Sequence, residues 1–209
     1  TVCVENPRRI KDFAKAMNYL NKTDRADALA IAEYLVRIGG SPWRLADPVM
    51  RELSALTRHR ICLQGEKNRL TNKLEHEANM ACLVVRQIKD AIQRAKDNVQ
   101  EIDERREQLI RENTPLSAQV DALTAIAGVG LTSAVLVLSQ MPDIDLFEDA
   151  ASWAAFAGVT PCRRESGLWR GKTFISKGGN AHVRSGLFIT AIVASQHNPV
   201  LKAFRDKLL

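Results

Sequence analysis

Two consecutive stretches of this 209-residue chain carry apolar residues at alternating spacings of three and four, a pattern that limits its central part to long helices. Polar Arg60 and Lys67 occupy skipped positions in the first stretch, and Arg106 interrupts the second. Such apolar stripes need a partner helix. The break near 79–83 permits either an antiparallel hairpin or one long helix that pairs with a second subunit, so we expect a spacer or dimerising element over 46–113. The apolar positions are Leu53, Leu56, Leu63, Leu70, Leu74, Val85, Ile88, Ile92, Ala95, Val99, Ile102 and Leu109.

The composition also favours helices. Apolar residues make up 45% of the chain and charged residues 26%, while aromatic residues account for only 5%, which is low for a β-sandwich. We therefore expect a mainly α protein. No stretch approaches the roughly 20 continuous apolar residues of a membrane span, and the N-terminus lacks a signal-peptide pattern.

The cysteines and histidines form no recognisable metal or disulfide pattern. Cys3, Cys62, Cys82 and Cys162 lie far apart, without a CxxC pair, and the four histidines do not cluster. We expect neither a zinc site nor a disulfide framework. A reduced, cytoplasmic setting follows as the expectation.

The first 45 residues have the pattern of a domain's end. Residues 1–4 alternate like the end of a strand, Asn6-Pro7 breaks the pattern, and 8–20 and 24–38 are expected to be helices, the second ended by Gly39-Gly40. This segment is too short to fold alone as a sheet domain. We expect the tail of an α/β domain whose earlier strands lie upstream of Thr1.

The last segment, 114–209, begins with apolar helical runs on both sides of Gly128-Val129-Gly130, the pattern of a helix-hairpin-helix. Glycines let a backbone approach a phosphate closely, and the free N–H groups at a helix start point at such an anion. Tight helical turns also use glycine for purely steric reasons, so both roles stay open for Gly128 and Gly130. Further helices are expected at 150–157, ended by Gly158, and at 181–195, capped by Ser176 or Asn180.

A dense basic cluster surrounds one serine in this segment. Residues 163–184 contain six Lys or Arg and one acid, whereas 114–162 contain five acids and no Lys or Arg. Arginine forks suit phosphate oxygens, so a hydroxyl at Ser166 is placed to act on a phosphodiester. The net charge of +6 and pI of about 9.3 favour an anionic partner such as nucleic acid. A solvated loop with an incidental serine is the alternative. The six basic residues are Arg163, Arg164, Arg170, Lys172, Lys177 and Arg184.

Four motifs, in order, carry a resemblance to a known family. They are NKTDRADA at 21–28, IAGVGLTSA at 126–134, FAGVTP at 156–161 and RESG at 164–167, with the long helices between the first and the second. In this combination the chain resembles the insertion-sequence 110 family of DEDD transposases. The resemblance implies a RuvC-like N-terminal domain, a coiled coil, and a compact helical transposase domain with a serine nucleophile. It also implies recombination guided by a structured RNA from the family's own element.

The resemblance assigns roles to three residues. It implies that Ser166 is the nucleophile and that Asp24 and Asp27 are the last two carboxylates of a Mg²⁺ site. The first Asp and the Glu of that set belong to strands upstream of Thr1, so we expect the site to be incomplete. From the residues alone, two carboxylates three apart at a helix start share one face and suit Mg²⁺, but they are also an ordinary helix-start pattern.

The resulting hypothesis is a transposase or site-specific recombinase. Ser166 would form a phosphoserine link to DNA with help from Mg²⁺, while Arg163, Arg164, Arg170 and Lys172 would hold phosphate oxygens. We expect DNA, a guide RNA and further copies of the chain, as a dimer or tetramer through the coiled coil, as partners, and a nucleoid-associated location. A non-catalytic, DNA-binding and dimerising fragment is the alternative. A purely structural coiled-coil adaptor would explain neither the polarised charge nor the Gly-Val-Gly turn.

Overall fold

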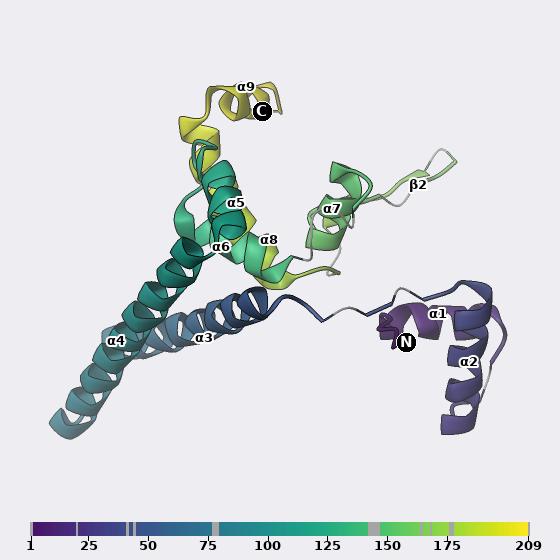
Figure 1. Cartoon of the computed structure of the whole chain (residues 1–209), viewed down its shortest axis with the longest axis horizontal. Helices are drawn as coiled ribbons and strands as arrows, with labels where there is room; N and C mark the ends of the chain where they lie inside the picture. Colours follow the sequence, from purple (N-terminus) through teal and green to yellow (C-terminus); the bar gives the residue numbers. More distant parts are fainter. Residues whose placement is uncertain are drawn as a thin grey trace. The chain divides into compact units, whose positions relative to one another are not determined.

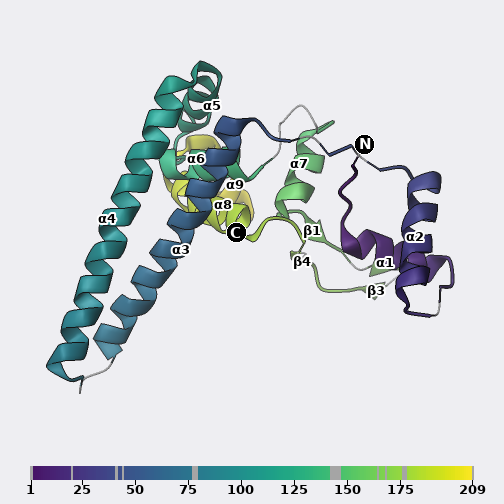
Figure 2. The ribbon, with the colours of Figure 1, turned by 60° about the horizontal axis from the view of Figure 1, so that its bottom comes forward.

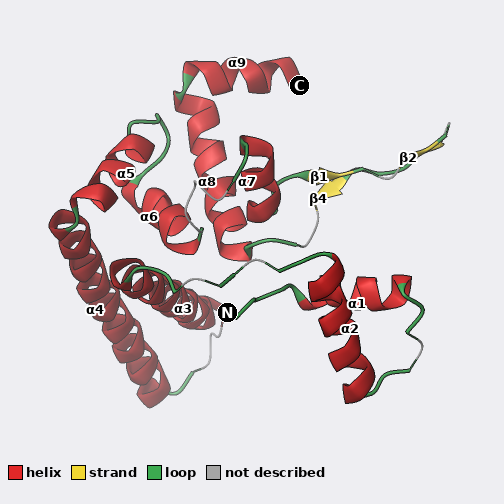
Figure 3. Ribbon diagram, turned by 45° about the vertical axis from the view of Figure 1, so that its right-hand side comes forward, coloured by secondary structure: helices red, strands yellow, loops and turns green. Residues whose placement is uncertain are grey.

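The computed structural model describes residues 2–19, 21–40, 42–43, 45–76, 80–141, 147–163, 165–167, 169–175 and 178–208, with the backbone alone at Arg170. Within these ranges the chain forms two compact units, Thr1–Asp47 and Pro48–Leu209. Both consist mainly of helices (Figure 1 and Figure 3), so the predicted mainly α class is confirmed. The predicted division into segments 1–45, 46–113 and 114–209 remains a prediction. So does the interpretation of the first segment as the end of an α/β domain.

The first unit contains helices α1 (Pro7–Ala16) and α2 (Asp24–Arg37). They pack through an edge-to-face contact between Phe13 and Tyr34, whose ring centroids lie 5.4 Å apart. Helix α1 is shorter than the sequence predicted, because the chain leaves the helix at 17–18, where Asn18 has a left-handed φ of 62°. In the described part of this unit, strand-like pairing is limited to a β-bridge between Cys3 and Pro42.

The second unit begins with a long antiparallel hairpin of α3 (Pro48–His76) and α4 (Cys82–Glu112), visible in Figure 2. Ion pairs between Arg60 and Asp103 and between Arg105 and Glu52 cross the hairpin, and their order along the two helices is that of an antiparallel pair. The hairpin decides between the two arrangements that the sequence left open. The apolar stripe of α4 is used within the chain, against α3, and its buried members include Ile88, Ala95, Ile102 and Leu109.

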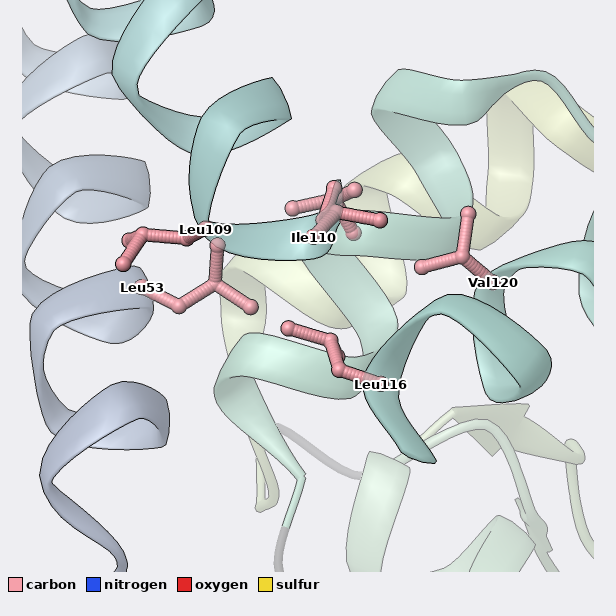
Figure 4. Packing of buried hydrophobic residues seen from close by; sticks show 6 residues of the cluster. Leu53, Leu109, Ile110, Leu116 and Val120 are labelled. Carbon is pink, nitrogen blue, oxygen red and sulfur yellow. The ribbon is translucent and has the colours of Figure 1, made fainter. Parts of the chain in front are cut away.

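The hairpin shares its core with the next two helices, α5 (Thr114–Thr124) and α6 (Leu131–Gln140). Figure 4 shows Leu53 of α3 and Leu109 of α4 beside residues from α5. Burial of such side chains contributes about 1.5–3 kcal/mol each. This common core makes 48–209 one compact unit. The cluster comprises Leu53, Leu109, Ile110, Leu116, Val120 and Val135.

The remaining elements carry the basic cluster. Helix α7 (Ala150–Ala157) starts at a capping box formed by Asp149 and Ser152. Four two-residue strands follow, β1 (Pro161–Cys162), β2 (Glu165–Ser166), β3 (Trp169–Arg170) and β4 (Phe174–Ile175). Helices α8 (Ala181–His197) and α9 (Pro199–Leu208) end the unit. The sequence predicted a loop where the structure has these strands.

A second apolar cluster anchors α7 and α8. Met141, Ala157 and Val183 are buried together, with Trp153 and Leu187 packed against them. None of the helices in the described ranges is long and apolar enough to cross a bilayer. All four cysteines are free thiols.

Candidate functional site

Ser166 lies at the tip of a small β-hairpin. We call residues 159–175 the serine ribbon. Strand β1 pairs antiparallel with β4, and β2 pairs antiparallel with β3, so that Ser166 is opposite Trp169. The chain turns directly after Ser166, where Gly167 has a φ of 58°, a left-handed conformation that glycine adopts without strain. Figure 1 shows β2 extending away from α7. This pairing, rather than a loop, holds the serine.

The side chains of the serine ribbon are largely exposed. Ser166, Arg163 and Lys172 are all exposed, and Trp169 is 59% exposed. Arg164 and Lys177 lie outside the described residues, and so does the side chain of Arg170, whose backbone pairs with Glu165. Exposed cations together with an exposed tryptophan form a surface suited to a nucleic-acid backbone and its bases.

The two ends of the serine ribbon meet at a close backbone crossing. Gly158 ends α7 in a left-handed conformation, and Gly179 is also left-handed. A Cβ on Gly179 would lie 2.6 Å from the backbone nitrogen of Gly158, and one on Gly158 would overlap the carbonyl oxygen of Gly178. Only glycines fit this crossing.

Arg184 joins both sides of the crossing. Its Nη1 donates to the carbonyl of Gly178 at 2.9 Å and to that of Gly158 at 3.5 Å. The sequence pattern assigned Arg184 to nucleic-acid binding and did not indicate these backbone bonds. The glycines at 158 and 178–179, which flank the serine ribbon, were the available signal.

The two glycines of the Gly-Val-Gly turn differ in their surroundings. Gly128 has a φ of 100°, and a Cβ there would overlap the backbone of Ala194 on α8. Gly130 is the exposed N-cap of α6 and has no side-chain cap, and a Cβ added to it would meet open space out to 4 Å. Packing therefore explains Gly128, while Gly130 leaves a helix start open to an anion.

Asp24 and Asp27 lie in the other compact unit, in the first turn of α2, where both are exposed. Asp27 lines a hollow of about 640 Å³ formed by α1 and α2, and Lys11, Lys15 and Lys22 line the same hollow. The described residues contain no group of three or more His, Cys, Asp or Glu that could hold a metal ion. Asp24 does not line this hollow, so the two aspartates do not form one site within it.

Comparisons with known proteins match nearly the whole chain. The profile of the Transposase IS116/IS110/IS902 family matches residues 120–206, and a DEDD transposase profile of the IS110 type matches residues 1–82. The chain is 27% identical over 195 residues to pilin gene-inverting proteins of Moraxella bovis and Moraxella lacunata, which covers 93% of this chain and 60% of each relative.

The chain is also similar, over a shorter range, to an insertion-element protein. It is 28% identical over 102 residues to the insertion element IS110 uncharacterized 43.6 kDa protein of Streptomyces coelicolor, covering 44% of this chain and 25% of that protein. The chain thus spans about 60% of the length of the pilin gene-inverting proteins.

Proposed function

The chain belongs to the IS110 family of transposases, and from this premise we propose that it acts in DNA recombination with Ser166 as the nucleophile. The observation that carries the proposal is the position of Ser166, exposed at the turn of a ribbon that also exposes Arg163 and Lys172. A hydroxyl on such a tip can reach a backbone phosphate without the rest of the protein entering a groove. Cations beside it stabilise the charge that develops on the phosphate oxygens.

Each step of the proposed chemistry forms one phosphoester bond and breaks another. The Oγ of Ser166 attacks phosphorus and its proton passes to solvent, while the bond to the 3′-oxygen breaks and that oxygen takes a proton from solvent to leave as a hydroxyl. A 3′-hydroxyl of another strand then attacks the phosphoserine, which rejoins DNA and restores Ser166. No external energy source is required, because each ester replaces another.

DNA is the proposed partner of two surfaces, the serine ribbon and the open start of α6 at Gly130. Arg164 and Lys177, which lie outside the described residues, are proposed as contacts to DNA from the sequence alone. Two of the relatives are named as pilin gene-inverting proteins, and inversion of a gene is a recombination of the class proposed here. A guide RNA, a nucleoid-associated location and Mg²⁺ are further proposals, which rest on the family.

Self-association is also proposed, but no longer through the apolar stripe of α4. The apolar stripe of α4 packs against α3 of the same chain, so a second copy would contact the outer faces of the hairpin or other helices. Exchange of strands between two DNA sites requires several cleavages. Because each Ser166 nucleophile makes one cleavage, more than one copy of the chain should act together.

A non-catalytic DNA-binding fragment is the second candidate. The exposed cations of the serine ribbon suffice for this candidate, because binding through charge needs no nucleophile. A covalent trapping experiment separates the two. With a nicked DNA substrate and Mg²⁺, a recombinase in its full-length form gives a protein–DNA adduct that Ser166→Ala abolishes while DNA affinity stays unchanged. A binding fragment gives affinity and no adduct.

A further inference from the structure

We propose that Arg184 is a positioning residue that closes the base of the serine ribbon and so fixes where Ser166 meets its substrate, rather than a contact to DNA. The inference rests on the proposed function of Ser166. The ribbon leaves the helical core at Gly158 and returns to it at Gly178.

The rigidity of the ribbon depends on its base. Its ladders comprise two pairs each, β1 with β4 and β2 with β3, and Ser166 belongs to the outer ladder. Two-stranded ribbons of this length are marginal in water. The position of Ser166 must therefore be set by whatever holds the two ends together.

Arg184 is suited to this task by its place in the fold. It lies in the first turn of α8, next to Val183, which is fully buried in the cluster that joins α7 to α8. From there its Nη1 bonds carbonyls on both sides of the crossing. A cation near the last carbonyls of α7 is favoured by the helix dipole, and bonds from a charged donor are stronger than neutral ones.

The same contacts set Arg184 apart from the other basic residues of the cluster. Arg163 and Lys172 are exposed, whereas Arg184 is partly buried and directed at protein carbonyls. A displacement of about 1 Å at a reacting group can cost on the order of 100-fold in rate. Loss of the bridge should therefore reduce the rate of cleavage more than it reduces affinity.

The test compares Arg184→Lys with Lys172→Ala in the full-length protein that carries this sequence. Lysine keeps the charge, but its side chain is shorter and ends before the position from which Nη1 of Arg184 donates to both carbonyls. We expect Arg184→Lys to lower the rate of adduct formation at saturating DNA by about 100-fold and to leave the salt dependence of binding unchanged. Lys172→Ala should reduce the log-log salt slope by about 0.9, the value for one phosphate contact. An unchanged rate in Arg184→Lys would overturn the proposal.

A second measurement uses the 209-residue chain and requires no catalysis. Hydrogen exchange of the amides in 159–175 should become faster in Arg184→Lys and in Arg184→Ala, while exchange in the α3 and α4 hairpin is unchanged. Equal exchange in the ribbon of wild type and variants would refute the bridge. Faster exchange combined with a wild type that forms no adduct would instead refute the role of Ser166 and leave the bridge standing.

Discussion

The carboxylate of Asp103 on α4 binds Arg60 on α3 through two parallel hydrogen bonds, with Nε–Oδ1 at 2.7 Å and Nη2–Oδ2 at 3.0 Å. The same carboxylate accepts a bond of 2.7 Å from Arg106, whose side chain is only 5% exposed. Burial lowers the pKa of Arg106, and its Nε has no hydrogen-bond partner. One acid thus serves two guanidinium groups inside the hairpin.

Removal of this acid should destabilise the hairpin more than removal of the buried cation. Asp103→Ala leaves Arg106 buried without its counter-charge, and we expect a loss of about 2–3 kcal/mol, below the full cost of a buried pair because Asp103 is about one-third exposed. Arg106→Leu restores the apolar stripe and should be neutral or stabilising. Urea unfolding followed by circular dichroism measures both. Glu52→Ala, which breaks the more exposed pair with Arg105, is the control and should cost less than about 1 kcal/mol. Equal losses in all three variants would contradict this view of the hairpin.

Substitutions of the two glycines in the Gly-Val-Gly turn should affect different properties, stability for Gly128 and DNA binding for Gly130. Gly128→Ala meets the backbone of Ala194 and a left-handed φ, so we expect a loss of about 1–3 kcal/mol in the free energy of unfolding. Gly130→Ala meets no neighbour and should change stability by less than about 1 kcal/mol, while it weakens DNA binding by blocking close approach of a phosphate. Thermal melts and fluorescence anisotropy with labelled DNA give the two readouts. Unchanged affinity in Gly130→Ala would remove this helix start from the interface.

Electrostatic contacts from the serine ribbon should dominate the affinity for DNA. We expect the log-log dependence of affinity on salt to become less steep by about 0.9 for each of Arg163→Ala and Lys172→Ala. Lys89→Ala, an exposed lysine on α4, is the matched control and should leave the slope unchanged. A salt slope near zero in the wild type would remove nucleic acid as the partner of this surface.

Periodicity predicted the helices well because each depends on local pattern. The break between the two long helices, the extent of α7 and the start of α8 all agree with the sequence. Periodicity could not choose between a hairpin and a pair of subunits, because the same apolar stripe serves both. It also treated Arg106 as an interruption, whereas the structure buries Arg106 and pairs it with Asp103.

The residues of the candidate site were chosen from the sequence, but their geometry could not be predicted from it. Charge and the serine motif singled out Ser166 and its basic neighbours, but strands of two residues have too little pattern to be recognised. Formal charge also grouped Arg184 with the exposed cations, since sequence does not show which guanidinium groups are already bonded to carbonyls. The steric role of Gly128 depends on α8, which is more than fifty residues away in the chain.

The most direct test of the central claim identifies the residue that becomes linked to DNA. The full-length protein is trapped on a nicked substrate with Mg²⁺, digested with protease, and the peptide carrying the nucleotide is sequenced by mass spectrometry. We expect a phosphoserine ester at Ser166, its loss in Ser166→Ala, and DNA affinity in that variant equal to that of the wild type. A nucleotide attached to any other residue, or an adduct that survives Ser166→Ala, would contradict this role of Ser166.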